Sequence, residues 1–170
     1  MAYQEENLKE KIESTCKGKN TMPAELTELI KFEATQEAPL QGYFELHWFD
    51  AEVLSNFIKD PKMQERFVVF GKAADGYPYA LWLDDNDVQR VVRFYSGDCA
   101  NYLADSFMDF MLLLSMGHFE EEGEKNANFQ PWIQKTFGIT IPESDTELMK
   151  NIKTNDEAFV KWMHAYCEEF

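Results

Sequence analysis

Few side chains in this sequence have both the type and the spacing that chemistry requires. The candidates for a nucleophile, a base or a metal ligand are scattered along the chain: His47, His118, His164, Cys16, Cys99 and Cys167. A catalytic thiol needs a base beside it. The fold could bring His118 close to Cys99, but no local sequence motif supports such a pair. No CxxC or Cys/His cluster of the kind that holds zinc is present. We therefore expect no catalytic residue, no metal and no cofactor.

The run Asp84-Asp85-Asn86-Asp87 is the segment that comes nearest to an ion site. It lacks the alternating ligands, the central Gly and the distal Glu of an EF-hand loop. Asp and Asn are also common in tight turns, because their side chains accept hydrogen bonds from the nearby backbone. We therefore interpret this run as a turn between two strands that needs no metal.

A second acidic run follows the middle of the chain, at Glu120, Glu121, Glu122 and Glu124. Two carboxyl groups can hydrolyse a glycosidic bond only when they face each other across a cleft and one of them has a raised pKa. Clustering in the sequence does not show that arrangement. We interpret the run as an exposed acidic loop.

The chain carries a large excess of negative charge. Its 31 Asp and Glu residues against 16 Lys and Arg give a formal net charge of −15. This charge opposes binding to nucleic acid or to an anionic membrane, and it would steer a basic protein toward the chain. The alternative interpretation is that the charge only favours solubility. No apolar run approaches the length of a membrane span and no leader sequence is evident, so we expect a cytoplasmic protein with a basic protein partner.

The secondary structure predicted around these residues indicates one α+β domain. Three short segments, 67–71, 77–83 and 88–95, are rich in Val, Phe, Tyr or Trp and are joined by short turns. Short turns join antiparallel strands. The alternating segment 42–48 predicts a further strand, so we expect an antiparallel sheet of four or more strands. The apolar helix 107–116, capped by Ser106, should pack against that sheet.

Helices are predicted on both sides of this centre. Before it, we expect a helix over 5–16, a second helix capped by Thr21, and a short helix over 51–58. After it, the segment 118–170 is interpreted as a helical tail that begins with a helix over 130–137. Two capping-box patterns follow, Ser144 with Glu147 and Thr154 with Glu157.

The second of these patterns opens a strongly amphipathic helix over 157–168. Its apolar side chains recur at spacings of three and four residues. Trp162 and Tyr166 should dock this helix against the rest of the domain.

Several short motifs occur in a recognisable order across residues 22–116. They are Phe70-Gly71, Asp75-Gly76-Tyr77-Pro78-Tyr79-Ala80, Val91-Val92, Tyr102-Leu103-Ala104-Asp105-Ser106-Phe107 and Phe110-Met111. In this order they resemble the SUKH superfamily, which contains bacterial immunity proteins and the fungal regulators of cell-wall assembly. Its typical core has a glycine-turned strand pair, a strand with paired valines and a helix entered through Ala-x-Ser-Phe. The resemblance implies one SUKH-like α+β domain over 1–170, with 118–170 as a helical extension.

The resemblance also implies a function. It favours a non-catalytic protein-binding module, specifically a bacterial immunity protein that binds and neutralises a toxin such as a nuclease or a deaminase. A nuclease must present Lys and Arg to phosphates, so an acidic surface suits its inhibitor. We expect the acidic contact residues to be Asp84, Asp85, Asp87, Glu120, Glu121, Glu122 and Glu124.

Two alternatives remain open from the sequence. One is a regulatory interaction protein of the cell-wall-assembly type. The other, disfavoured by the lack of a catalytic motif, is a small-ligand-binding or enzymatic domain on the same fold.

Overall fold

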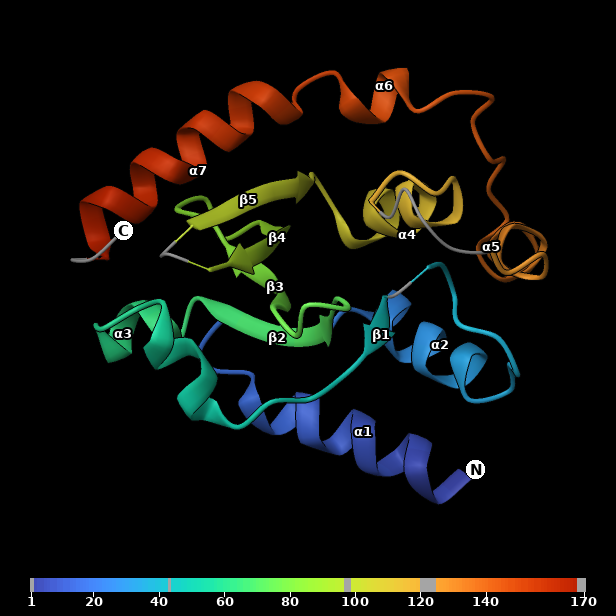
Figure 1. The fold of residues 1–170 in the computed structure, drawn as a ribbon, viewed down its shortest axis with the longest axis horizontal. Coiled ribbons are helices and arrows are strands. Elements are labelled where there is room, and N and C mark those ends of the chain that lie inside the picture. Colours follow the sequence, from blue (N-terminus) through green and yellow to red (C-terminus); the bar gives the residue numbers. More distant parts are fainter. Residues whose placement is uncertain (1, 43, 97–98, 120–124, 168–170) are drawn as a thin grey trace.

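The computed structural model describes residues 2–42, 44–96, 99–119 and 125–167, without the side chains of residues 2–5, 51 and 99 (Figure 1). Its centre is a five-stranded sheet with strands in chain order. The strands are β1 (Glu45–Leu46), β2 (Phe67–Lys72), β3 (Pro78–Leu83), β4 (Gln89–Tyr95) and β5 (Cys99–Ala104). Every neighbouring pair is antiparallel. The predicted antiparallel α+β fold is thus confirmed.

Both faces of the sheet are buried, because successive apolar side chains of a strand point to opposite faces. On one face lie Val68, Phe70, Tyr79, Leu81 and Val91. On the other lie Phe67, Val69, Ala80, Trp82, Val92 and Phe94. The sequence pattern of β3 and β4 did not reveal which face is inside, and the structure shows that both are.

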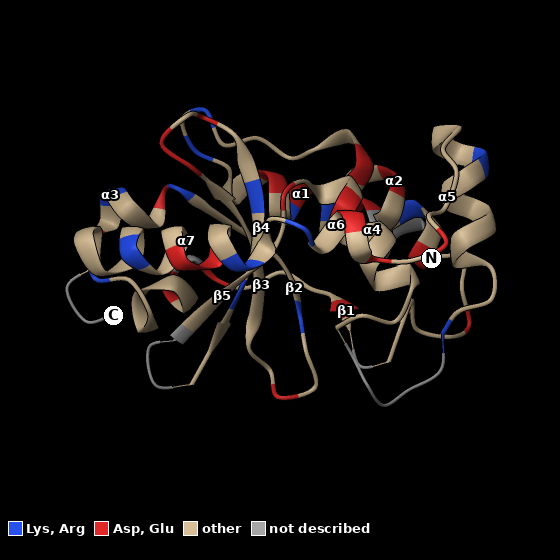
Figure 2. Cartoon of the chain, turned by 90° about the horizontal axis from the view of Figure 1, so that it is seen from above, with Lys and Arg blue, Asp and Glu red and all other residues tan. Residues whose placement is uncertain are grey.

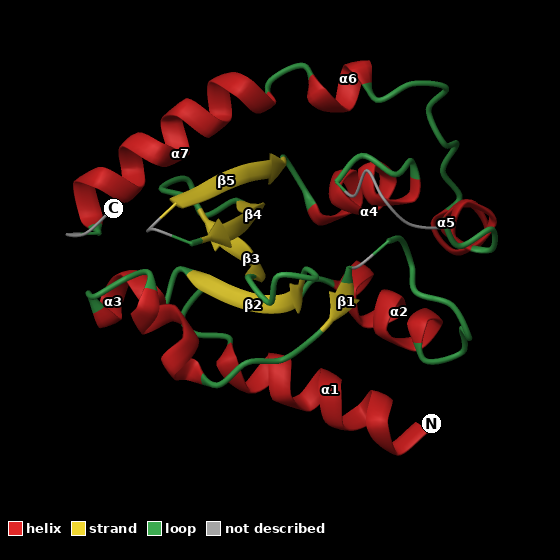
Figure 3. Cartoon of the chain, in the orientation of Figure 1, coloured by secondary structure: helices red, strands yellow, loops and turns green. Residues whose placement is uncertain are grey.

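The first face is covered by α2 (Ala24–Glu33) and α4 (Phe107–Ser115), and α5 (Phe129–Phe137) packs beyond them in the same apolar core (Figure 3). Phe110 of α4 is fully buried and meets the ring of Phe70 edge-to-face, with ring centroids 5.5 Å apart. The hydroxyl of Ser106 accepts a hydrogen bond from the Asp109 amide at 3.1 Å and caps α4. The predicted core helix and its cap are therefore confirmed.

The second face is covered by the 3-10 helix η1 (Ala51–Asn56), the short helix α3 (Pro61–Gln64) and the long helix α7 (Ile152–Tyr166). Trp162 of α7 packs on Trp82 of β3, with ring centroids 5.2 Å apart. Tyr166 contacts the Trp162 ring but is 50% exposed. The prediction that α7 docks through both side chains is therefore right for Trp162 and wrong for Tyr166.

Two remaining helices pack at the margins of these layers. Helix α1 (Ala2–Thr15) runs beneath the edge of β2 and anchors itself through the buried Ile12 (Figure 1). Helix α6 (Thr146–Met149) joins the end near α5 to α7. No helix in the described segments is long and apolar enough to cross a membrane.

Several predicted element ends differ from those observed. Thr21 does not cap α2, which begins after Pro23. Thr154 lies inside α7, because that helix already begins after Asn151, and α6 begins after Asp145 rather than Ser144. These capping boxes fail because Ser, Thr, Asp and Asn crowd this segment and compete for the same positions. Strand β5 was not predicted at all.

Candidate functional site

The predicted acidic turn lies between β3 and β4, where the chain must reverse between Leu83 and Gln89. One carboxylate oxygen of Asp84 accepts hydrogen bonds from the amides of Asn86, at 2.9 Å, and Val88, at 3.0 Å. Asp87 has a left-handed backbone, with φ of 60°, which Asp tolerates better than most residues. The interpretation of this run as a strand-joining turn is thus confirmed.

The largely buried side chain of Asp84 stabilises the turn. Its second carboxylate oxygen pairs with the Nε of Arg90 at 3.1 Å, and its side chain is only 12% exposed. Burial alone raises the pKa of Asp84, but the hydrogen bonds from Val88, Arg90 and Asn86 outweigh burial and hold the pKa below its usual value. Asp84 is therefore an internal anchor whose carboxylate is turned away from solvent.

Asp85 and Asp87 point outward and connect the turn to distant parts of the chain. The carboxylate of Asp85 accepts hydrogen bonds from Arg66 at 3.0 Å and from the indole of Trp162 on α7 at 3.1 Å. Asp87 forms an ion pair with Lys19, in the segment between α1 and α2. The side chains of Asp85 and Asp87 are 63% and 43% exposed. Both can reach a partner's surface.

A polar hydrogen-bond network extends from the turn to the N-terminal end of α7. Asp105 accepts hydrogen bonds from the hydroxyl of Tyr102, at 2.6 Å, and from Asn155 of α7, at 2.7 Å. The backbone oxygen of Asp105 accepts a further bond from Arg90 at 3.0 Å. Burial first, and then the bond to Asp105, raise the pKa of Tyr102. A hollow of about 220 Å³ lies beside these residues.

The chemistry of this site is that of a rigid hydrogen-bonded surface. Each of the three turn carboxylates is engaged by a cation of the same chain, so no carboxylate in the turn is left as a free base. Such a turn is pre-organised and loses little side-chain entropy when a partner docks on it. The internal cations also reduce the negative charge that the turn itself offers.

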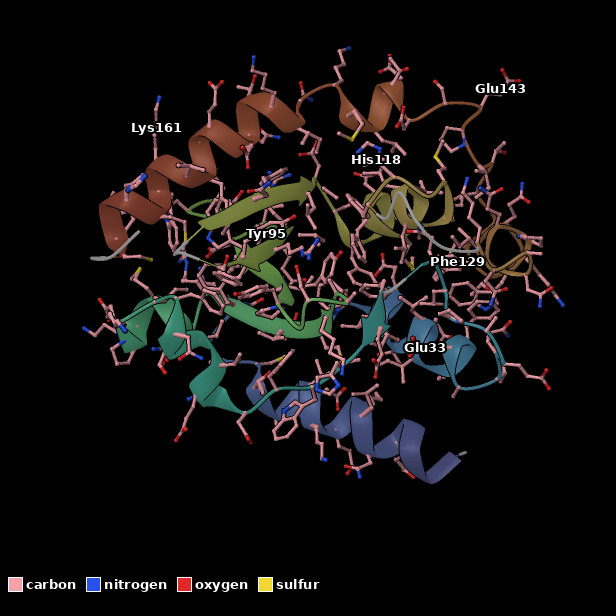
Figure 4. The ribbon with its side chains drawn as sticks, in the orientation of Figure 1. Glu33, Tyr95, His118, Phe129, Glu143 and Lys161 are labelled. Atoms are coloured by element: carbon pink, nitrogen blue, oxygen red, sulfur yellow. The ribbon has the colours of Figure 1, made fainter. Side chains whose placement is uncertain are left out.

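The second predicted acidic group, Glu120, Glu121, Glu122 and Glu124, lies outside the described residues. Whether it adjoins the β3–β4 turn therefore stays untested. The same holds for a pairing of His118 with Cys99, because the Cys99 side chain is not described. His118 itself lies under α6, where its Nδ1 is 2.9 Å from a carboxylate oxygen of Asp145 (Figure 4).

The other histidines and cysteines form no constellation of their own. Burial first, and then nearby Lys72, lower the pKa of His47. Cys167 is buried on the second face of the sheet, and burial raises the pKa of its thiol to about 11. Within the described part of the chain, no group of three or more His, Cys, Asp or Glu is arranged to hold a metal ion.

An acidic stripe on α1 was missed in the sequence. Glu6, Glu10 and Glu13 follow one another at spacings of four and three, which places them on one side of the helix. They border a shallow hollow between α1 and α2 together with Lys9 and Lys31. Acidic positions recur on α1, α2, α6 and α7 and so are distributed over the molecule (Figure 2). The helical spacing of the three glutamates was the available signal.

Comparison of the chain with protein-family models, with curated proteins and with solved structures finds no match. The SUKH resemblance therefore stays a prediction from the sequence.

Proposed function

We propose that this chain is a non-catalytic protein-binding module that recognises a basic partner, and that it acts as a bacterial immunity protein by covering the toxic surface of that partner. The observation that carries the proposal is the net charge of −15. An excess of this size creates a negative potential that accelerates encounter with a basic surface. The sequence resemblance adds the biological class.

The distribution of the basic side chains strengthens this argument. All three arginines of the chain are held in ion pairs: Arg66 with Asp85, Arg90 with Asp84 and Arg93 with Asp75. Cations that are already paired present little positive surface of their own. The three arginines therefore add little positive surface that would repel a basic partner.

The β3–β4 turn is the described surface that suits the contact best. Its exposed carboxylates, Asp85 and Asp87, project from a backbone that Asp84 fixes by accepting hydrogen bonds from two backbone amides. A fixed turn can hold its carboxylates against Lys or Arg of a partner without ordering a loop first. The acidic run at 120–124 is the second expected contact.

The experiment uses a partner captured from the source cell and purified. Its association rate with the chain is measured by stopped flow at low and high salt. Steering by charge predicts that the rate falls as salt rises. Three sets of charge reversals are compared with the wild-type chain. Two lie at the expected contacts: Asp85→Lys with Asp87→Lys, and Glu120→Lys with Glu121→Lys and Glu122→Lys. The third, Glu143→Lys with Glu147→Lys, is a matched pair on another surface.

The two sets of reversals at the expected contacts should slow association about tenfold or more at low salt. The Glu143 and Glu147 pair carries the same charge change as the turn pair, so it reports the effect of net charge alone. Thermal melts confirm that each variant is folded. An acidic captured partner, or equal rates for all variants, would refute the electrostatic part of the proposal.

A further inference from the structure

A small hollow lies where α7 passes the β3–β4 turn, and we refer to it as the α7 pocket. It is the hollow of about 220 Å³ beside the Asp105 network. Helix α7, which runs along β5 in Figure 1, contributes Asn155, Ala158 and Trp162 to its lining. These residues recur at spacings of three and four and so share one side of the helix. The small side chain of Ala158 leaves space between the helix and the turn.

The lining of the α7 pocket includes a buried hydrogen-bond donor without an acceptor. Trp82 of β3 lines the pocket and is only 6% exposed. Its Nε1 is buried and has no hydrogen-bond partner among the residues that the structure describes. The second indole of the pocket differs, because Nε1 of Trp162 donates to Asp85. Since an indole nitrogen can only donate, Trp82 requires an acceptor such as a carbonyl oxygen.

The charges around the α7 pocket are balanced. Asp84 and Arg90 both line it and pair with each other at 3.1 Å. Asp85 also lines it and pairs with Arg66 at 3.0 Å. Both hydrogen bonds that Asp85 accepts from described residues use its Oδ1, so its Oδ2 can accept a further one. The pocket therefore offers a donor and an acceptor to a ligand and favours a neutral ligand over an ion.

We propose that the α7 pocket binds a small neutral ligand that carries a primary carboxamide on a planar ring. The carboxamide oxygen accepts a hydrogen bond from Trp82, and its NH₂ group donates to Oδ2 of Asp85. The ring lies against the indoles of Trp82 and Trp162. The pocket is smaller than the roughly 300–1,000 Å³ of sites for drug-sized molecules, so it suits a single ring. This inference goes beyond the proposed function, because it requires no protein partner.

The first test is a titration of the full chain with benzamide, followed through the indole N–H signals in heteronuclear NMR. A ligand of this size should bind with a Kd of about 1–10 mM. The Trp82 signal should move downfield, because its N–H gains a hydrogen bond. The Trp162 signal should move less, since this indole already donates to Asp85. Trp48 and Trp132 lie outside the pocket lining and should not respond. Single Trp→Phe variants assign the signals.

Three analogues of benzamide test the chemistry of recognition. N,N-dimethylbenzamide lacks the N–H donor, benzylamine is a cation without the acceptor, and benzoate is an anion. At about 0.15 M salt, where long-range attraction is screened, each should bind at least about fivefold more weakly than benzamide. Benzylamine that binds as tightly as benzamide would show that the pocket takes cations.

Substitutions on α7 test the position of the ligand. Ala158 is exposed, so Ala158→Phe should fill the pocket, leave the core intact and raise the Kd about tenfold or more. The matched control is Ala165→Phe, at an exposed alanine of α7 outside the pocket lining, which should change the Kd less than about twofold. Trp82→Phe removes the N–H and should weaken binding about fivefold. Thermal melts confirm that each variant is folded.

The inference is overturned if about 50 mM benzamide leaves the Trp82 signal in place, if benzylamine binds as tightly as benzamide, or if Ala158→Phe binds as well as the wild type. If Trp82→Phe does not fold, the wild-type titration and the two alanine variants still decide the question. A benzamide complex that shifts the Trp82 signal and is lost in Ala158→Phe alone of the alanine pair is the result expected.

Discussion

Glu33 is the carboxylate whose surroundings give the sharpest prediction of stability. It ends α2 beneath β1, where its Oε1 accepts a hydrogen bond from the Leu46 amide at 3.3 Å (Figure 4). Burial first raises its pKa, the Leu46 bond partly lowers it, and Glu45 raises it again, to about 7. Glu33→Gln keeps an acceptor for Leu46 and removes the ionisation.

The sign and size of the effect follow from linkage. The usual pKa of a glutamate is 4.5, so between pH 4.5 and 7 the folded chain holds a proton that the unfolded chain has released. Stability therefore falls as pH rises through this window. When the pH rises from below both pKa values to above both, the ionisation of Glu33 lowers the free energy of unfolding by at most about 3.4 kcal/mol. About 2.5 kcal/mol of this loss falls between pH 5 and pH 8.

The assay is urea unfolding of the wild type and Glu33→Gln at pH 5 and pH 8. The free energy of unfolding of the variant, relative to wild type, should rise by up to about 2.5 kcal/mol between these two pH values. Glu28→Gln, on the same helix, is the control and should show no comparable rise, since its side chain reaches solvent and pairs with the exposed Lys31. Equal pH dependence in wild type and Glu33→Gln would refute the reasoning.

Three further substitutions test the core and the turn. Phe110→Ala should cost about 3–5 kcal/mol in urea unfolding, because it empties a fully buried site; a loss below about 1 kcal/mol would show that the site collapses or is not core. Gly71→Ala should cost about 1–3 kcal/mol, since its Cβ would lie 2.8 Å from Cε2 of the buried Phe44 and 3.1 Å from the Glu45 oxygen; a thermal melt unchanged from wild type would contradict that contact. Asp84→Asn should cost about 1–3 kcal/mol at pH 7 by weakening the bond to Arg90. Because the folded pKa of Asp84 is lowered, its contribution is present above about pH 4 and is lost as pH falls through the folded value, so the variant and wild type should converge in acid.

The central strands were predictable because their signals are local. Segments 67–71, 77–83 and 88–95 agree with β2, β3 and β4 to within about one residue at each end. The turn at Asp84 was also predictable, since Asp and Asn supply their own backbone hydrogen bonds. Core helix α4 followed from an apolar run behind a serine cap.

Strand β5 was not predictable in the same way. Its sequence, Cys99–Ala104, contains no β-branched residue and reads as neither strand nor helix. It becomes a strand because it pairs with β4, where Ala100 lies opposite Phe94 and Tyr102 opposite Val92. Tertiary pairing therefore decides this element.

The candidate site was predictable only as a list of charges. Sequence identified Asp84, Asp85 and Asp87 as one acidic turn but treated the three carboxylates as equivalent. Their partners, Arg90, Arg66 and Lys19, lie up to 68 residues away in the chain. No local pattern shows that Asp84 faces inward while Asp85 and Asp87 face outward.

The central claim is that the chain disables a basic protein by binding it. The direct measurement is a titration of the captured partner's own activity, such as cleavage of nucleic acid, against increasing amounts of the chain. The claim predicts that activity falls linearly to zero at a fixed molar ratio and that the captured protein carries a net positive charge. A partner that stays fully active when the complex is saturated would contradict it.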